Sequence, residues 1–185
     1  GGNFTSVRPP GSALGQNEVE RRHLAAFDTK TGDLLPWAPK LTSPAQPFTG
    51  TPDANCNSLG GTQYECASVW SVRPSPDKTM LYVGGAFQFV DGKARSFVAA
   101  FNLPSGTLNT TFKPQMNGRV YAIAPTNSNV YLGGSFTKAA GQLRTRLAAV
   151  TKANALLPWA PTADGQVTSL AMTPDESRVV VGGRF

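Results

Sequence analysis

The sequence predicts an all-β protein made of repeated four-stranded antiparallel sheets. Two observations lead to this prediction. The tetrapeptide Gly-Gly-x-Phe occurs at 1–4, 84–87, 133–136 and 182–185, and the last two spacings are both 49 residues. The chain also has 19 Gly and 15 Pro among 185 residues, and only 15% of its residues are charged. A fixed period of this length with many turns is typical of an array of β-sheet units.

Three further markers recur in a fixed order after the double glycine. The first is an Ala-Ala segment, at 24–27, 98–101 and 147–150. An arginine stands three residues before each of these segments: Arg21, Arg95 and Arg144. The second marker is an aromatic residue followed by a proline: Trp37, Phe112 and Trp159. The third is an alternating apolar segment, at 69–72, 120–123 and 167–170.

Each period supplies four short strands. The first is the alternating segment, and the second runs into the double glycine. The third is the Ala-Ala segment, and the fourth leads to the aromatic residue, as at 108–112. Turn signals such as Ser105-Gly106 separate them. Four short antiparallel strands in about 40–50 residues are typical of a β-propeller blade. We therefore expect 69–112 and 120–159 to form two superposable four-stranded sheets.

These motifs resemble the delta-sixty repeat family of secreted actinobacterial β-propellers. The resemblance depends on Gly-Gly-x-Phe, on Gly-x-x-Arg-x-x-Leu-Ala-Ala as at 92–100 and 141–149, on Thr-Gly and on Pro-Trp-Ala-Pro. It covers the chain outside two insertions. It implies a propeller that is often attached to other modules of a large exported protein, and it implies no established activity. The third copy departs from the pattern at 152–155, where Thr-Gly is expected.

We expect residues 1–185 to form a single propeller segment. Its periods are 1–83, 84–132 and 133–181, and the next begins at 182. Because propellers usually close with about four to eight blades, three do not make a ring. We therefore expect the segment to belong to a larger ring, completed by further blades of the same chain or by a partner chain.

The first period is 34 residues longer than the others, and the excess falls in two insertions, at 5–20 and 40–68. The first joins the second and third strands, and the second joins the fourth strand to the next blade. In an up-down-up-down blade both connections emerge at the same end, where long loops often carry binding residues. The candidate residues in these loops are Glu18, Glu20, Asp53 and Tyr64.

The two cysteines, Cys56 and Cys66, lie in the second insertion. A metal site would need further ligands near the cysteines, and a catalytic thiol would need a base. The only histidine, His23, is distant in the sequence, so neither kind of site is favoured. Their spacing and context favour a disulfide that staples the loop. Such a disulfide predicts an oxidising compartment, and hence a secreted or cell-surface protein.

Charge and motifs exclude several functions. The net charge of +6 is spread along the chain rather than clustered with aromatic residues, so no nucleic-acid partner is expected. No apolar run is long enough to insert into a membrane as a helix. No metal site, cofactor or phosphate-binding loop is predicted. A mildly basic surface is the simplest interpretation of the charge, and attraction to an anionic cell-wall polymer is the alternative.

The recurring residues have a structural and a functional interpretation. Arg21, Arg95 and Arg144 are expected to hold the framework by donating to loop carbonyls or to an acid, rather than to bind a repeated anion. Trp37, Phe112 and Trp159 are expected to pack between blades, rather than to stack on sugars. The paired glycines are expected to allow a positive backbone angle and a close approach of strands.

Three functions remain open at this point. The first is a non-catalytic extracellular scaffold or protein-interaction propeller. The second is a propeller that binds a carbohydrate or a cell-wall polymer, which a repeated ligand site would favour. The third is a secreted hydrolase with its site in the loops, which a converging carboxylate pair near 40–68 would favour.

Overall fold

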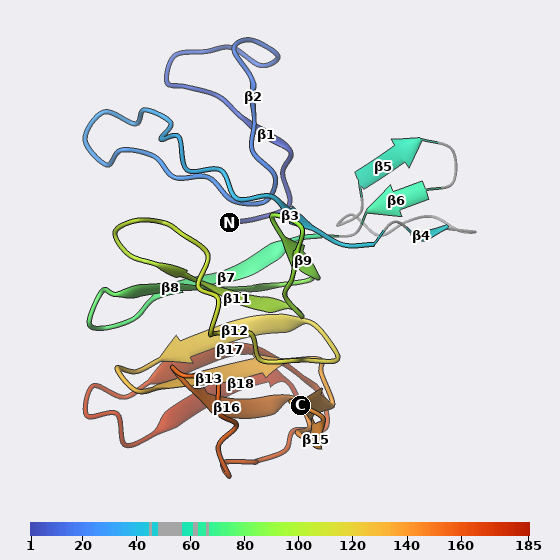
Figure 1. The fold of residues 1–185 in the computed structure, drawn as a ribbon, viewed down its shortest axis with the longest axis vertical. Coiled ribbons are helices and arrows are strands. Elements are labelled where there is room, and N and C mark those ends of the chain that lie inside the picture. Colours follow the sequence, from blue (N-terminus) through green and yellow to red (C-terminus); the bar gives the residue numbers. More distant parts are fainter. Residues whose placement is uncertain (45, 48–56, 61–62, 66) are drawn as a thin grey trace.

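The computed structural model describes residues 1–44, 46–47, 57–60, 63–65 and 67–185. Every regular element among these residues is a β-strand, and the strands form several small antiparallel sheets (Figure 1). In this part of the chain the sheets follow one another without closing into a ring. The described residues include no helix long and apolar enough to cross a membrane.

Two sheets of identical topology form the centre of the molecule. The first consists of β7 (Val69–Pro74), β8 (Met80–Gly85) and β11 (Val98–Asn102). The next consists of β12 (Val120–Pro125), β13 (Asn129–Gly134) and β16 (Leu147–Thr151). In both, the second strand along the chain is the middle strand of the sheet. The hairpin of β17 (Gln166–Met172) and β18 (Val179–Arg184) repeats the first two strands. We call residues 1–39, 69–112, 120–159 and 166–185 the first to fourth units.

The predicted fourth strand is wrong as an extended strand. It is reduced to a single bridge in each of the first three units, between Phe27 and Leu34, Phe101 and Leu108, and Val150 and Leu156. In the second unit, the side chain of Asn109 accepts hydrogen bonds from the backbone N–H groups of Thr111 and Phe112. These bonds close a local turn in place of a sheet ladder. The two central sheets are therefore three-stranded with one extra bridge. The predicted third and fourth strands of the first unit are likewise confined to the bridge between Phe27 and Leu34.

The paired glycines allow close packing, but not through positive backbone angles as the sequence suggested. None of these glycines has a positive φ. A Cβ on Gly84 would lie 2.9 Å from Val120, and a Cβ on Gly133 would lie 2.5 Å from Val167. The first glycine of the pair thus lets the next sheet approach. A Cβ on the second glycine, as on Gly134, would lie 2.0 Å from the carbonyl oxygen of Arg119, the residue just before β12.

The first strands of successive sheets lie against one another, β7 against β12 and β12 against β17. Each begins with the same irregularity, because the register shifts after Val69, Val120 and Val167. At the next position Trp70 and Tyr121 contact each other, with ring centroids 4.8 Å apart. The guanidinium of Arg119 lies 5.8 Å from the centroid of the Trp70 ring. The sheets therefore share one stacked inner edge.

Short hairpins, which the sequence analysis did not predict, occupy the connections between second and third strands. They pair β9 (Phe89–Val90) with β10 (Lys93–Ala94), and β14 (Lys138–Ala139) with β15 (Gln142–Leu143). In the first unit, β1 (Ser6–Val7) pairs with β2 (Val19–Glu20). The turns at Asp91-Gly92 and Ala140-Gly141 have positive φ at both residues, which suits a two-residue hairpin.

The second insertion begins as part of the repeated architecture. β3 (Leu41–Thr42) pairs with β9 of the next unit, just as Met116 bridges Ala139 one unit later. Leu41 is fully buried and Met116 is nearly so. Beyond β3, the insertion contains a small sheet in the order β4-β6-β5, from β4 (Gln46–Pro47), β5 (Asn57–Gly60) and β6 (Gln63–Glu65).

The core consists of two clusters that each join neighbouring units. One cluster includes Phe112 of the second unit together with Phe136 and Val150 of the third. The other includes Leu24 of the first unit together with Phe87 and Phe101 of the second. Because apolar burial supplies the main stabilising term, neither half of a cluster would be stable alone. The units hold together by packing on their neighbours.

Candidate binding surface at the loop end of the sheets

Two kinds of connection meet at one end of the sheets, which we call the loop end. One is the hairpin between the second and third strands of a unit, and the other is the segment that joins one unit to the next. The connection from one unit to the next pairs with the following unit's hairpin, through β3 and β9 and through the Met116–Ala139 bridge. The backbone N–H of Ala140 also donates to the carbonyl of Gln115. Both insertions belong to connections of these two kinds (Figure 1).

The bases of the two insertions lie close together in the first unit. A cavity of about 150 Å³ is lined by residues of both bases: Glu20, Arg21, Arg22, Ala38, Pro39 and Lys40. Glu20 accepts a hydrogen bond of 2.7 Å from Nε of Arg22. This bond and the charge of Arg22, together with the more distant Lys40, lower the pKa of the Glu20 carboxyl. The cavity therefore has a cationic wall, formed where the two insertions leave the sheet.

The structure places only part of the predicted site. Glu18 is exposed and accepts a hydrogen bond of 3.0 Å from the hydroxyl of Ser6. Glu20 is engaged by Arg22, so these two carboxylates have separate partners. Tyr64 is described only as a backbone position in β6. Asp53, Cys56 and Cys66 lie outside the described residues, so the disulfide remains a prediction.

The three recurring arginines make the same two hydrogen bonds. In each, Nη1 donates to the carbonyl of the preceding residue, and Nη2 donates to a carbonyl near the bridge of the fourth segment. For Arg95 the acceptors are Ala94, at 2.7 Å, and Asn109, at 2.9 Å. Arg21 bonds to Glu20 and Leu35, and Arg144 to Leu143 and Leu157. This geometry supports a framework role, because it ties the hairpin to the outer edge of the sheet.

Arg95 is unusual among these arginines because it is only 5% exposed. Within the described residues, neither of its acceptors is an acid, and its buried Nε–H has no acceptor. Burial also lowers the pKa of Arg95, because a charged group loses hydration in the protein interior. Buried charges are normally compensated by a counter-charge. This guanidinium is held by carbonyl dipoles alone.

A second cavity repeats the first one at the next unit. It has a volume of about 370 Å³ and is lined by Ala94, Arg95, Ser96, Lys113 and Gln115. Arg95 stands where Arg21 stands in the first cavity, and Gln115 takes the place of Lys40. Each lining has two more cationic than anionic side chains. The repeated arginine was visible in the sequence, but the cavity was not. Its second charged residue, Lys113, is replaced by alanine at the equivalent positions, Ala38 and Ala160, and so gave no repeating signal.

A third and larger cavity, of about 480 Å³, adjoins the first. The two share Ala38 and Pro39 in their linings, and the larger one also includes Trp37, Asp91 and Lys93. Lys93 is the neighbour of Ala94 in β10, and Ala94 lines the second cavity. The Trp37 cavity therefore adjoins the first cationic cavity and extends from the hairpin of the second unit to the turn at Gly106 and Thr107.

The aromatic markers pack within and between units. The ring of Trp37 meets Phe101 of the second unit edge-on, and its Nε1–H donates to the carbonyl of Gly106 at 2.8 Å. Phe112 meets Tyr82, and Trp159 meets Tyr131, in edge-on contacts with centroid distances of 5.0 and 5.1 Å. Trp37 is only partly buried and also lines the cavity described above. Packing fixes its position and leaves part of it open to a ligand.

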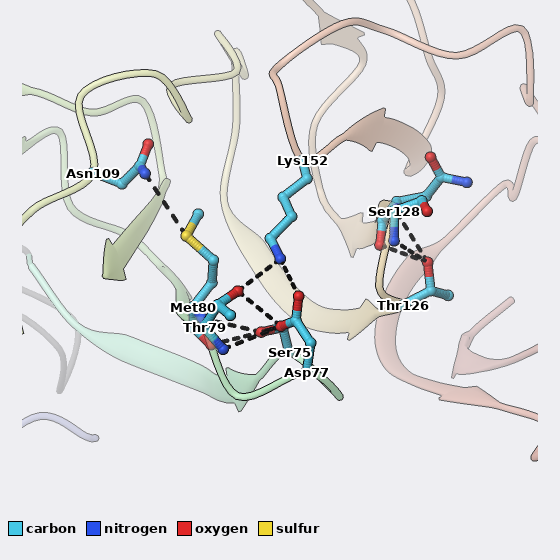
Figure 2. Close-up of polar contacts among 9 residues, drawn as sticks. Ser75, Asp77, Thr79, Met80, Asn109, Thr126, Ser128 and Lys152 are labelled. Carbon is cyan, nitrogen blue, oxygen red and sulfur yellow. Dashed lines mark hydrogen bonds and ion pairs between the residues drawn. The ribbon is translucent and has the colours of Figure 1, made fainter. Parts of the chain in front are cut away.

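At the opposite end of the sheets, a polar cluster joins the second and third units (Figure 2). Nζ of Lys152 forms an ion pair with Asp77 and donates to the hydroxyl of Thr79 at 2.7 Å. The hydrogen bond from Lys152, followed by those from Ser75 and Thr79, holds the pKa of the Asp77 carboxyl far below its usual range. Lys152 belongs to the segment that departs from Thr-Gly, and Asn154 there keeps the positive φ of Gly32 and Gly106.

Comparison with known proteins yields no further identification. No protein-family model matches the chain, and no curated protein matches it either.

Proposed function

We propose that this chain is a segment of a non-catalytic extracellular β-propeller, related to the delta-sixty repeat proteins, whose loop end binds a partner. Support for a propeller comes from the repeated sheet topology, the shared inner edge of β7, β12 and β17, and the identical register shift at the start of each. Consecutive small antiparallel sheets in this relation are the pattern of propeller blades. Further blades, from a longer chain or a partner chain, would complete such a ring.

The proximity of the two insertion bases is the observation that favours a binding function. Both expansions arise beside one cavity, the one that contains Glu20 and Lys40. The sheets themselves need neither expansion, because the later units connect the same strands without them. Long loops carried by a rigid scaffold often bind partners. A partner at this end would contact both insertions together.

A loop excision tests this proposal. Leu41 and Thr42 must be kept, because β3 pairs with β9 and Leu41 is buried. Residues 43–67 are replaced by one glycine, which reproduces the connection of the next unit, where Gly118 precedes Arg119. We expect the circular-dichroism spectrum to be retained and co-sedimentation with purified cell-wall sacculi to be lost. Lys78→Gln, in a turn at the opposite end of the sheets, is the control and should sediment normally. Sedimentation that survives the excision would place the binding surface elsewhere.

Binding of a carbohydrate or cell-wall polymer is the second candidate function, and the repeated cationic cavity favours it. A hydrolase has less support from the described residues. Glu18 and Glu20 are engaged by Ser6 and Arg22 respectively, rather than facing each other across a cleft. A secreted or cell-surface location is part of the proposal and depends on a disulfide between Cys56 and Cys66.

A further inference from the structure

We propose that the two cationic cavities, together with the Trp37 cavity that adjoins the first of them, bind an anionic polysaccharide whose carboxylates lie at the two cationic cavities. This inference rests on the proposed binding function and names its ligand class. We call these three cavities the track: the cavity of Arg21 and Lys40, the adjoining cavity of Trp37, and the cavity of Arg95 and Lys113 in the next unit.

The charge of Arg95 is the first argument. Its guanidinium has five N–H donors, and the structure engages two of them, both with carbonyl oxygens. The side chain is nine-tenths buried, yet the cavity that it lines contains no acid. Lys113 adds a second positive charge at the exposed rim. A carboxylate in this cavity would supply the missing counter-charge and accept charge-assisted hydrogen bonds.

The repetition of the site is the second argument. The cavity of Arg21 has the same position in the preceding unit and the same excess of two positive charges. The two arginines are fixed by equivalent hydrogen bonds, so the positions of their guanidiniums are set before any ligand binds. A ligand that carries the same charge at regular intervals matches such a pair better than a single small anion does.

The Trp37 cavity indicates what chemical group links the charges of the ligand. It combines the partly exposed indole of Trp37 with the side chains of Asp91, Lys93 and Thr107. Oδ1 of Asp91 already accepts a hydrogen bond of 2.8 Å from the backbone N–H of Lys40, which fixes the carboxylate. An aromatic surface beside polar groups that donate and accept hydrogen bonds suits the apolar faces and hydroxyl groups of a sugar. The track therefore fits a linear polymer of acidic sugars.

Polygalacturonate is the probe for the test, with neutral dextran and polyphosphate as comparisons. Calorimetry at low salt should show binding of polygalacturonate to the unmodified chain and none of dextran. Lys40→Gln and Lys113→Gln each remove one exposed charge from a cationic cavity, so affinity should fall about tenfold in the double variant. Lys78→Gln removes the same charge from the opposite end and should change affinity less than about twofold. Unchanged circular-dichroism spectra would exclude unfolding of these variants.

Three results would overturn the proposal. An equal loss in Lys78→Gln would show attraction by net charge alone. Polyphosphate binding as tightly as polygalacturonate, with the same dependence on Lys40 and Lys113, would show that the track recognises charge without sugar. Absence of polygalacturonate binding would exclude the ligand class. If the loop excision still abolishes sedimentation with cell walls in that case, the proposed binding function stands and only the ligand is wrong.

Discussion

At the scale of single residues, the same backbone position repeats with different side chains. His23, Phe97 and Arg146 each stand two residues after the recurring arginine, and each has a positive φ near 70°. The backbone N–H groups of Phe97 and Arg146 donate to Phe87 and Phe136, and that of His23 donates to Phe4. The backbone thus sets the conformation, and the side chain is free to vary. The sequence did not reveal this position, because the residue types share no pattern.

His23 makes the protein sensitive to acid. It is fully buried. Burial is the main cause that lowers the pKa of His23, so the folded state keeps the imidazole neutral. The unfolded chain takes up a proton below its ordinary pKa of about 6.5. Stability from this group is therefore present above that pH and is lost as the pH falls, by up to about 1.4 kcal/mol per pH unit.

His23→Phe tests this, because phenylalanine occupies the same position at Phe97. Urea unfolding of the variant should show a smaller decrease in the free energy of unfolding between neutral and mildly acidic pH than the unmodified chain does. The readout is the difference in the free energy of unfolding between the two pH values. A change in overall stability that is the same at both pH values does not affect this difference. An unchanged pH dependence would mean that His23 is protonated in the folded state.

At the scale of elements, the turns between first and second strands recur with one important difference. Asp77 and Asp175 each accept a hydrogen bond from the hydroxyl two residues before them, Ser75 in one turn and Thr173 in the other. Hydrogen bonds from Thr173 and then Ser177 lower the pKa of Asp175 to about 2. Asp77 is in addition paired with Lys152 of the third unit. The turn is a local motif, and the lysine adds a link between units.

Lys152→Gln should raise the pKa of Asp77 toward the lower part of the ordinary carboxyl range, because the largest cause of its shift is removed. The pKa of Asp175 should not change, since its hydrogen bonds are all within its own turn. Carbon-detected NMR titration of the two carboxyl groups measures both values in one sample. Equal shifts at both aspartates, or no shift at Asp77, would contradict the link between units.

The elements also show how far the sequence could be interpreted. The first three strands of the central sheets follow from alternation and from the double glycine, and their predicted positions agree with β7, β8 and β11 to within a few residues. In the second unit the fourth strand failed because Asn109 binds backbone N–H groups that a ladder would need. In the first and third units a proline, Pro36 or Pro158, stands in this segment and has no N–H to donate to a ladder. The hairpins escaped notice because two-residue strands such as β9 carry no periodicity. The cavities escaped notice because they join segments far apart in the sequence.

At the scale of the whole molecule, the sheet of β12, β13 and β16 is the one that neighbouring sheets cover on both sides. Both β12 and β13 contact the following hairpin, and β12 also contacts β7 and β8 of the preceding sheet. Leu132 in β13 is fully buried, whereas the equivalent Val181 in β18 is partly exposed and its neighbour Val180 is 59% exposed. Within the described chain, β18 pairs with β17 alone. Stability should therefore decrease from the third unit to the fourth.

Hydrogen exchange tests this gradient in the chain of residues 1–185. Amides of β13 should exchange far more slowly than equivalent amides of β18, because β13 is paired on both sides and can open only by disrupting two strand pairs. Leu132 and Val181 provide a matched comparison, since both precede a double glycine. Comparable protection of the two amides would show that β18 is covered by a further strand, such as that of another copy of the chain.

The glycine contact between sheets has a consequence for how such arrays change length. Gly84 receives Val120 and Ile123, and Gly133 receives Val167 and Leu170 in the same way. The two joints are therefore equivalent at this contact. A recombination event that removes or duplicates one period of 49 residues would leave each remaining glycine with a compatible partner, so the array can gain or lose a unit without a clash at this contact. The unit, rather than the residue, is then the natural step by which this protein lengthens or shortens.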